Sequence, residues 1–377
     1  MAMPQKRKLL AVFPSMFDAL GGIQTYCHAV AKSFDNIASR RDWTVEILAL
    51  NDRSDVVVPS GYFDPQRVQY RGFERNKKNF AGSCIQAARH ADVAFFGLVR
   101  FSPIAAGMKI ANPRIKVLSA LHGVEAWVRL SWGQRLGLRF MDGLASVSAY
   151  SAGRFADANG FNRHAITILP CTLDPLYQTW HDGASETFVP KDRRVLLTVS
   201  RLDPIDDYKH VDDVIRTMPG VLRSVSDAFY VIVGDGPDRP RLEALASDLK
   251  VSDAVRFEGR VPDAVLTQYY RDCSLFVLPS SGEGFGIVYL EAMYYAKPCI
   301  GVRAGGAQEV IVDGGTGLLT SEGDIAALEK SIITLLQRQD LAQQYGLNGK
   351  KRLDSEYSME IFERRIEGLI DQTLPAG

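Results

Sequence analysis

The chain has 377 residues, of which 46% are hydrophobic and 23% are charged, the composition of an ordinary globular protein. This length allows two domains, each with a sizeable core. The 44 basic and 44 acidic residues give a formal net charge of +0, so no global attraction to nucleic acid or membranes is expected, and such an affinity must come from a local patch.

The cysteines and the apolar runs bear on the compartment. The five cysteines are scattered, odd in number and without a C-x-x-C pair, which argues against a disulfide framework or a zinc site and for a reducing compartment. The apolar run Leu9–Pro14 is too short for a signal peptide and is typical of a first strand. No run approaches the roughly 18–20 apolar residues of a spanning helix. We expect a cytoplasmic protein, either free or peripheral on the inner face of the membrane.

Strand-like segments alternate with helical stretches in the first half of the chain. Such alternation predicts parallel strands joined by crossover helices, and therefore a doubly wound α/β sheet. The expected strands are Leu9–Phe13, Val45–Leu50, Val93–Phe96, Ile115–Ala120, Leu144–Val147 and Ile166–Leu169.

Two glycine-containing turns follow strands of this half. Gly21 and Gly22 precede a helical segment, and His122 with Gly123 comes just after another strand. Because ligands of such sheets bind at the carboxyl ends of the strands, both turns can face one crevice. A histidine there can hydrogen-bond a sugar or a leaving phosphate, although a lone histidine is more often a packed or solvated residue. No G-x-G-x-x-G follows the first strand, which disfavours a dinucleotide oxidoreductase.

Two stretches combine basic and aromatic side chains. Residues 71–80 (RGFERNKKNF) hold four basic residues and one acid, and residues 127–140 (WVRLSWGQRLGLRF) hold three arginines, two tryptophans and no acid. One interpretation is a solvated loop and an amphipathic helix packed on the core. The other is an interfacial surface that meets anionic lipid or a lipid-diphosphate acceptor.

A linker separates the two halves. Residues 170–190 lose clear periodicity and contain three prolines and a glycine, so we place the domain boundary here, with domains at 1–175 and 176–357. Strand patterns then resume, which predicts a second sheet of the same kind. Its expected strands are Arg194–Ser200, Ala228–Val233, Val255–Phe257, Ser274–Leu278 and Pro298–Val302, and helices near 324–337, 341–347 and 358–369 close the chain.

Two basic residues follow the first strand of the second half. Arg201 stands at the strand end, and Lys209 stands eight residues later near the start of a helical stretch. An arginine and a lysine in these places can grip a diphosphate from two sides. The alternative is a pair of exposed bases without a ligand.

A strand–turn–helix unit at Ser280–Ala292 (SSGEGFGIVYLEA) carries the densest chemistry of the chain. Its three glycines allow close approach of a ligand, and the start of the following helix offers N–H groups that suit a phosphate. Glu283 lies in the turn, and Glu291 lies about one turn into the helix. By itself, such a unit is also compatible with a plain strand–helix turn with surface glutamates.

The E-x7-E spacing around G-F-G resembles the nucleotide-sugar site of retaining glycosyltransferases of the GT-B fold, family four. Further features agree in their order along the chain, and together they cover nearly all of it. They are Gly21-Gly22, His122, Arg201 with Lys209, Glu283 through Glu291, and a G-G-x-x-E pattern at Gly305, Gly306 and Glu309. The resemblance implies two Rossmann-like domains that face each other across a cleft, with a last helix (about 358–377) that packs back on the first domain.

The resemblance also implies roles for individual residues. His122 would lie beside the donor sugar, which Glu283 would bind, and Glu291 would bind the ribose hydroxyls. Arg201 and Lys209 would hold the pyrophosphate, although their spacing here is longer than the common form. The other implied donor contacts are Gly21, Gly22, Arg260, Val261, Gly284, Phe285, Gly286, Ile287 and Glu309; among these, Arg260 and Val261 would receive the nucleobase.

Breaking the bond to a nucleoside diphosphate develops negative charge on the leaving phosphate, which cations and N–H groups must neutralise. The chain shows no persuasive D-x-D motif at a strand end, because the acids in Asp52–Asp55 and Asp203–Asp207 resemble loop acids. We therefore expect a reaction without metal or other cofactor. The family resemblance implies retention of configuration, by front-face attack in which the leaving phosphate accepts the acceptor's proton. Domain closure would exclude water from the reaction.

The acceptor is the least defined part of the prediction. The basic-aromatic stretches favour a lipid-linked saccharide in cell-surface polysaccharide or glycolipid synthesis, and a mannosyl or glucosyl donor is the expectation from the resemblance. Alternatives are an inverting GT-B transferase or epimerase, and a non-catalytic nucleotide-sugar-binding partner subunit. The sequence leaves the donor base, guanine or uracil, open.

Overall fold

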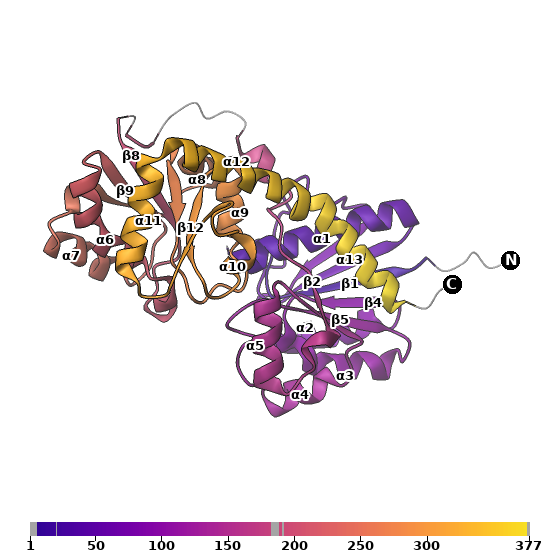
Figure 1. Cartoon of the computed structure of the whole chain (residues 1–377). Coiled ribbons are helices and arrows are strands. Elements are labelled where there is room, and N and C mark those ends of the chain that lie inside the picture. The colour runs from indigo at the N-terminus through magenta and orange to yellow at the C-terminus, as the bar shows by residue number, and fades with distance from the viewer. Residues whose placement is uncertain (1–5, 20, 182–187, 191, 375–377) are drawn as a thin grey trace. The chain divides into compact units, whose positions relative to one another are not determined.

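The computed structural model describes residues 6–19, 21–181, 188–190 and 192–374. The chain divides into two compact units (Figure 1). Unit 1 comprises Met1–Leu176 together with Tyr357–Gly377, and unit 2 comprises Tyr177–Glu356.

Unit 1 contains a seven-stranded parallel sheet in the order β3-β2-β1-β4-β5-β6-β7. The chain builds outward from β1 in one direction and then in the other, which is the doubly wound arrangement. The strands are β1 (Lys8–Phe13), β2 (Thr44–Ala49), β3 (Val68–Gly72), β4 (Val93–Phe96), β5 (Lys116–Leu121), β6 (Gly143–Ser146) and β7 (Ile166–Ile168). The helices are α1 (Gly22–Arg41), α2 (Lys77–Ala88), α3 (Ser102–Ala111), α4 (Trp132–Leu138), α5 (Ala149–Asn159) and α13 (Met359–Thr373).

Unit 2 contains a six-stranded parallel sheet in the order β10-β9-β8-β11-β12-β13. The strands are β8 (Arg194–Val199), β9 (Ala228–Val233), β10 (Val255–Gly259), β11 (Leu275–Val277), β12 (Cys299–Val302) and β13 (Gly317–Thr320). The helices are α6 (Val211–Ser224), α7 (Arg239–Asp248), α8 (Asp263–Asp272), α9 (Ile287–Tyr294), α10 (Ala307–Val310), α11 (Ile325–Gln337) and α12 (Gln339–Glu356).

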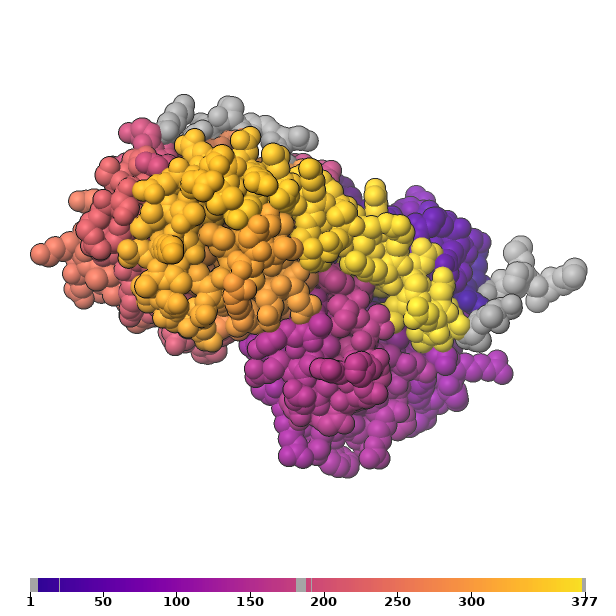
Figure 2. Space-filling view, viewed as in Figure 1, coloured from indigo at the N-terminus to yellow at the C-terminus, as the bar shows by residue number. Residues whose placement is uncertain are grey.

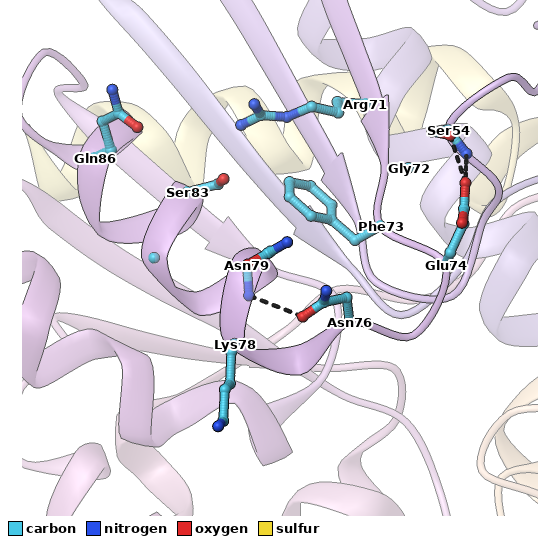
Figure 3. A pocket seen from close by; sticks show the side chains of 11 residues that line it. Ser54, Arg71, Gly72, Phe73, Glu74, Asn76, Lys78, Asn79, Ser83 and Gln86 are labelled. Atoms are coloured by element: carbon cyan, nitrogen blue, oxygen red, sulfur yellow. Dashed lines mark hydrogen bonds between the residues drawn. The ribbon is translucent and has the colours of Figure 1, made fainter.

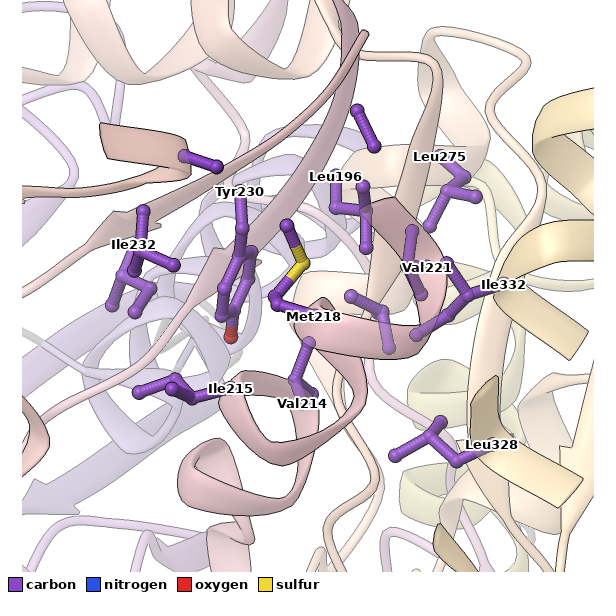
Figure 4. Packing of buried hydrophobic residues seen from close by; sticks show 14 of the residues in the cluster. Leu196, Val214, Ile215, Met218, Val221, Tyr230, Ile232, Leu275, Leu328 and Ile332 are labelled. Atoms are coloured by element: carbon purple, nitrogen blue, oxygen red, sulfur yellow. The ribbon is translucent and has the colours of Figure 1, made fainter. Parts of the chain in front are cut away.

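The central strands are apolar along their whole length because helices cover both faces of a parallel sheet. All six residues of β9 and all four of β4 are buried. In unit 2, one layer of core forms where α6 and α11 pack on the sheet (Figure 4). Its side chains include Leu196, Tyr230, Ile232 and Leu275 from the strands, and Val214, Met218, Leu328 and Ile332 from the helices. In a space-filling view, the visible face of unit 2 consists mainly of orange and yellow atoms from its last third (Figure 2).

The last helix of the chain belongs to unit 1, where α13 packs along α1. The rings of Tyr26 and Phe362 meet edge to face with centroids 5.5 Å apart. Farther along, Arg41 donates to Asp371 at 2.5 and 2.8 Å, and Arg40 donates to Glu367 at 2.8 Å. Apolar contact and ion pairs thus fix the end of the chain to its first helix.

The two basic-aromatic stretches differ from the expectation. Residues 71–80 are not a solvated loop, because they end the edge strand β3 and begin α2, and their aromatic residues Phe73 and Phe80 are buried. Residues 127–140 hold only the seven-residue α4, preceded by turns.

The sequence did not predict strand β13, because this strand begins directly after a glycine-rich turn. Among the described residues, no helix is long and apolar enough to cross a membrane.

Candidate functional site

The glycine-rich turn Ser280–Gly286 lies between β11 and α9, at the carboxyl edge of the sheet in unit 2. Geometry requires two of its glycines. A Cβ on Gly282 would lie 2.3 Å from the ring of Tyr208, and Gly286 begins α9 with a φ of 98°, which L side chains rarely adopt. The first turn of α9 carries no acidic side chain, so the positive end of the helix is left for an anion.

Lys209 and Glu283 form an ion pair at this turn. The Nζ of Lys209 donates to Oε1 of Glu283, and the two side chains are only 19% and 13% exposed. The loop before Lys209, a 3-10 turn at Pro204–Lys209, is fixed to the glycine-rich turn by the N–H of Ser281, which donates to the carbonyl of Tyr208 at 2.8 Å. The structure therefore brings these two predicted residues into direct contact.

Arg201 is held by a buried acid that the sequence did not suggest. Its Nε and a terminal nitrogen both lie 2.6 Å from one carboxylate oxygen of Asp206, and the hydroxyl of Tyr208 donates to the other oxygen at 3.0 Å. The hydrogen bond that Arg201 donates to Asp206 raises the pKa of Arg201. Asp206 is 5% exposed whereas the Arg201 side chain is 62% exposed, so a fixed anion orients a guanidinium that still faces solvent. Asp206 differs from the other aspartates of this loop by its burial, which cannot be seen in the sequence.

The pair Gly305-Gly306 lies directly against the glycine-rich turn. The N–H of Gly306 donates to the carbonyl of Glu283 at 2.7 Å, and a Cβ on Gly306 would lie 2.4 Å from the carbonyl oxygen of Gly284. Glu309 follows on the short helix α10, and its carbonyl accepts from Arg352 at 2.9 Å. The glycine-rich turn and the Gly305-Gly306 segment, 20 residues apart in the sequence, are thus packed directly on each other.

Arg260 and Val261 follow β10 at the same edge of the sheet. The N–H of Gly234, after β9, donates to the carbonyl of Gly259 at 2.8 Å, and a Cβ on Gly234 would lie 1.8 Å from the carbonyl oxygen of Ser200. The loops after β8, β9 and β10 are therefore in contact, and Arg260 is exposed beside them.

Glu291 lies on α9 and accepts a 2.7 Å hydrogen bond from the hydroxyl of Tyr270 on α8. Burial, together with the nearby carboxylate, raises the pKa of Tyr270 well above its ordinary value, so this tyrosine remains a donor. Tyr270 orients Glu291, and no sequence signal marked it, because a tyrosine inside a helix is usually a core residue.

His122 lies at the carboxyl end of β5 in unit 1 and is 7% exposed. Its Nε2 lies 2.8 Å from the carbonyl oxygen of Gly97, so this nitrogen carries the proton and Nδ1 keeps a lone pair. Burial lowers the pKa of His122, against the opposing effect of Glu125. The Glu125 carboxylate also accepts from the N–H groups of His122 and Gly123 at 3.0 Å, which fixes the turn.

Gly21 and Gly22 begin α1 at the same edge of unit 1. Just before these glycines in the sequence, three successive backbone N–H groups donate to the buried carboxylate of Asp52. They belong to Met16, Phe17 and Asp18, at 2.8, 3.0 and 3.3 Å. The hydroxyls of Ser15 and Tyr70 also donate to this carboxylate. Asp52, which the sequence suggested was a loop acid, is thus the anchor of the segment that leads from β1 toward α1.

One group of side chains in the described residues has the composition of a metal site: His210, Asp212 and Asp213, whose ligand atoms lie within 4.8 Å of one another. Asp212, however, already accepts from Arg216 at 3.0 Å and from Arg241 at 3.4 Å. His210 in turn contacts Asp213 and the hydroxyl of Ser281, so all three side chains at the start of α6 are engaged within the unit.

The carboxyl edge of unit 2 therefore offers two cations, an uncompensated helix start and two carboxylates within a framework of tightly packed glycines. Residues 184–352, which include all of these groups, match the family model described as glycosyl transferases group 1. Residues 184–352 therefore form a domain of the glycosyl transferases group 1 family.

Proteins similar to this chain are named as mannosyltransferases. A protein of Mycolicibacterium smegmatis named GDP-mannose-dependent alpha-(1-6)-phosphatidylinositol monomannoside mannosyltransferase is 32% identical over 62% of this chain and 64% of its own length. A Corynebacterium glutamicum protein, named for the monoacylated form of that acceptor, is 29% identical over 75% of this chain and 77% of its own. The match to the Mycolicibacterium protein thus spans just under two thirds of that relative.

Solved structures resemble this chain over almost its whole length. The Anabaena protein HepE in complex with UDP superposes with a TM-score of 0.77 at 18% identity, over 97% of this chain and 100% of that one. Sucrose-phosphate synthase from Thermosynechococcus elongatus gives 0.74 at 20% identity, over 97% and 99%. The prediction of a GT-B fold with two doubly wound parallel sheets is confirmed.

Proposed function

We propose that this group 1 glycosyl transferase moves a hexosyl group from a nucleoside diphosphate sugar to a saccharide acceptor with retention of configuration. The observation that carries the proposal is the pair of cations at one sheet edge, Arg201 and Lys209, beside the uncompensated start of α9. Cations and helix N–H groups are what the developing charge on a leaving diphosphate requires.

The diphosphate binds by exchange of counter-ions. Lys209 is paired with Glu283 before the donor arrives, and a phosphate oxygen takes over that contact while Glu283 turns to a hydroxyl of the donor sugar. Arg201 keeps its contact with Asp206 and presents its remaining N–H groups to the phosphate. In this scheme the protein supplies the positive charge, and the reaction needs no metal ion or other cofactor.

Other residues recognise the remaining parts of the donor. Glu291, oriented by Tyr270, binds the ribose hydroxyls, and the loop at Arg260 and Val261 receives the base. The backbone from Gly284 to Ile287, with Gly21, Gly22 and Glu309, completes the set of donor contacts. His122 accepts a hydrogen bond from a sugar hydroxyl at Nδ1, since its Nε2 proton is already donated to Gly97.

The first donor to test is GDP-mannose, because relatives at 29–32% identity are named GDP-mannose-dependent mannosyltransferases. UDP-glucose is the second, because solved structures of the same fold contain UDP and UDP-glucose. The names of those relatives also support a lipid-linked acceptor, in glycolipid or polysaccharide synthesis.

A lipid-linked acceptor calls for a surface that meets the membrane, and we assign it to the segment around α4. Four large apolar side chains there are exposed at intervals of four residues, and the arginines at 129, 135 and 139 accompany them. The apolar residues are Val124, Val128, Trp132 and Leu136, at 46%, 51%, 73% and 37% exposure. Such a combination suits an anionic, interfacial lipid surface, and residues 71–80, whose phenylalanines are buried, add only charge.

The donor site is tested by thermal shift of the full chain with GDP, UDP, ADP and dTDP in the presence of EDTA. A ligand at about 100 times its Kd adds about 2.7 kcal/mol to the free energy of unfolding, which is readily measured. We expect one diphosphate to raise the Tm selectively, and Glu291→Ala to reduce that rise. Absence of a shift with every nucleotide would remove the proposed donor site. Release of the free nucleotide in the presence of acceptor distinguishes transfer from the alternative of a non-catalytic sugar-nucleotide binder.

The membrane surface is tested by flotation with vesicles that contain or lack anionic lipid. Trp132→Ser should reduce recovery with anionic vesicles several-fold. Ile110→Ser is the matched control, because Ile110 is 83% exposed on α3 of the same unit but does not belong to this set of four apolar side chains. Equal recovery of all proteins with both kinds of vesicle would contradict the assignment.

A further inference from the structure

A second candidate site lies wholly in unit 1, beside the edge strand β3. An open cavity of about 750 Å³ is lined by the end of β3, the segment after it, and one face of α2 (Figure 3). None of the residues predicted from sequence to bind the donor lines it. The cavity is at the carboxyl edge of the sheet, where the loops that follow parallel strands bind ligands.

The helix side of the cavity is a stripe of uncharged polar groups. Asn79, Ser83 and Gln86 are spaced by four and three residues, so they project from the same face of α2. The neighbouring face of the helix carries Phe80 and Cys84, which are buried in the core. Amide and hydroxyl groups in a row along an open cavity match a ligand with several hydroxyls.

The strand side of the cavity carries a cation without a counter-ion. Arg71 extends from β3 toward the helix stripe, and its guanidinium lies 4.8 Å from the centre of the Phe73 ring, which holds it in place (Figure 3). In the described part of the chain, no carboxylate lies within 4.0 Å of a nitrogen of Arg71 or of Lys78 at the rim. The one acid of the lining, Glu74, accepts hydrogen bonds from Ser54 instead.

The rim of the cavity is held in a strained backbone conformation. Glu74 and Arg75 both have positive φ, 48° and 64°, and their N–H groups donate to the carbonyls of Asp52 and Leu50 at 2.8 Å. A Cβ on Gly72 would lie 2.1 Å from a carbonyl oxygen of the loop after β2. Non-glycine residues in this conformation persist where the surroundings fix them and are common at ligand clamps, so the rim is formed before a ligand arrives.

We propose that this cavity binds a phosphate-bearing polyol, either a sugar phosphate or the phosphodiester-linked polyol head of a lipid. The planar guanidinium of Arg71 binds the phosphate by two parallel hydrogen bonds, and the α2 stripe binds the hydroxyls. The identification of this ligand as the acceptor rests on the proposed function. The binding site itself does not, since donor contacts and cavity lining share no residue.

The soluble source is tested by calorimetric titration of the full chain with glucose 1-phosphate, glucose and inorganic phosphate, without any nucleotide. We expect the sugar phosphate to bind at least tenfold more tightly than either fragment. Arg71→Gln should weaken that binding at least tenfold. Arg75→Gln is the matched control, because Arg75 is exposed, four residues along the same segment, and outside the lining. Equal loss in both variants would show a diffuse charge effect and overturn the proposal.

A second pair of variants blocks the cavity without removing charge. A Cβ on Gly82 of α2 meets nothing within 4 Å, so Gly82→Leu fills the cavity without a clash. Gly153→Leu on α5 of the same unit also enters open space and is the control. We expect only Gly82→Leu to abolish binding, with an unchanged or higher Tm; binding that survives it would overturn the proposal.

The lipid source is tested with phosphatidylcholine vesicles with or without phosphatidylinositol. Binding to phosphatidylinositol vesicles that Arg71→Gln and Gly82→Leu both weaken, with no binding of glucose 1-phosphate, supports the cavity and identifies its ligand as a lipid head. No binding of either probe overturns it. The thermal shift with nucleoside diphosphates is read separately in the same variants and should be unchanged, so a failure of this proposal is distinguishable from a failure of the donor site.

Discussion

The carboxyl edges of the two sheets hold their charges in different ways. At the edge of unit 2, each cation assigned to the diphosphate faces a carboxylate, Arg201 with Asp206 and Lys209 with Glu283. At the edge of unit 1, the buried Asp52 is satisfied by backbone N–H groups and hydroxyls, and the buried His122 is held by a carbonyl.

The edge of unit 2 is therefore suited to exchange an ion pair for a ligand, whereas the buried groups at the edge of unit 1 fix the loops around them. The pair of Lys209 and Glu283 can be exchanged because an incoming phosphate supplies a new anion for Lys209 and a sugar hydroxyl supplies a new donor for Glu283, so neither charge is left without a partner. A buried carboxylate with several N–H donors cannot be replaced without leaving those donors unpaired. We therefore expect substitutions at the edge of unit 2 to change kinetics, and substitutions at Asp52 or His122 to change stability first.

Arg201→Ala should have the largest effect. Removal of a preorganised enzyme group that stabilises the charge on the leaving group typically lowers kcat by about 10²–10³-fold. We expect a loss of that size with little change in Tm. The measurement is steady-state transfer with saturating donor. Arg194→Ala is the control, because Arg194 begins the same strand β8 and pairs with Asp227 at the opposite end. A similar loss in both variants would mean that Arg201 acts only through the fold.

Glu291→Ala should follow, and its effect should appear in donor binding. Loss of charge-assisted hydrogen bonds to two ribose hydroxyls weakens binding by about 1.5–3 kcal/mol, or roughly tenfold to a hundredfold in Kd. Tyr270→Phe, which removes only the group that orients Glu291, should give a smaller change in the same direction. Titration with the nucleoside diphosphate measures both, and an unchanged Kd in Glu291→Ala would remove it from the donor site.

Asp52→Asn tests the frame of unit 1. An amide in place of the carboxylate turns a donor toward N–H groups that need an acceptor, and we expect a loss of about 2–3 kcal/mol in the free energy of unfolding. Asp227→Asn breaks a surface pair in unit 2 and should cost less than about 1 kcal/mol. Denaturant unfolding measures both, and equal losses would contradict the contrast between the two edges.

The same carboxylate predicts a pH dependence. Burial raises the pKa of Asp52, but the hydrogen bonds from Ser15, Tyr70 and the backbone outweigh that effect and hold it below the ordinary 3.8. The folded state therefore binds the proton less tightly than the unfolded state. The stabilisation is complete above about pH 4 and is lost as the pH falls through the folded pKa, a loss that Asp52→Asn should not show.

His122→Gln should have the smallest effect. Burial lowers the pKa of His122 below the ordinary 6.5, so the unfolded chain binds a proton that the folded chain resists. Wild-type stability should therefore fall as the pH drops below about 6.5, by at most about 1.4 kcal/mol per pH unit, and the variant should lose that slope. Unfolding curves between pH 5 and 8 provide the measurement; identical slopes would contradict a neutral, buried His122.

The sequence predicted the framework well because buried parallel strands have a strong signature. The expected strand Ala228–Val233 is identical to β9, and Leu9–Phe13 differs from β1 by one residue. The edge strand β3 was missed, since an edge strand is half exposed and Arg71 in its sequence resembles a loop residue. A short helix such as α4 also carries too few turns for its period to define its ends.

The candidate site was predictable where a residue type and a glycine pattern coincide, and not where burial decides. Glu283 and Lys209 stand out by motif, and the structure adds that they contact each other. Asp206 and Asp52 appeared as loop acids, because the N–H groups and hydroxyls that bind them come from distant segments. The roles assigned to Arg201, Lys209 and the other donor contacts stay predictions until the variants are measured.

The return of the last helix to unit 1 has a consequence for biosynthesis. The face of α1 that carries Tyr26 is covered by α13, whose Phe362 leaves the ribosome only after all of unit 2 has been made. At about 5–20 residues per second, the 180 residues from Tyr177 to Glu356 take roughly 10–40 seconds to synthesise. The nascent first unit therefore waits with an uncovered apolar face, while the second unit can complete its own fold. A stop codon before residue 357 would leave that face open permanently, and such a product should be a client of chaperones.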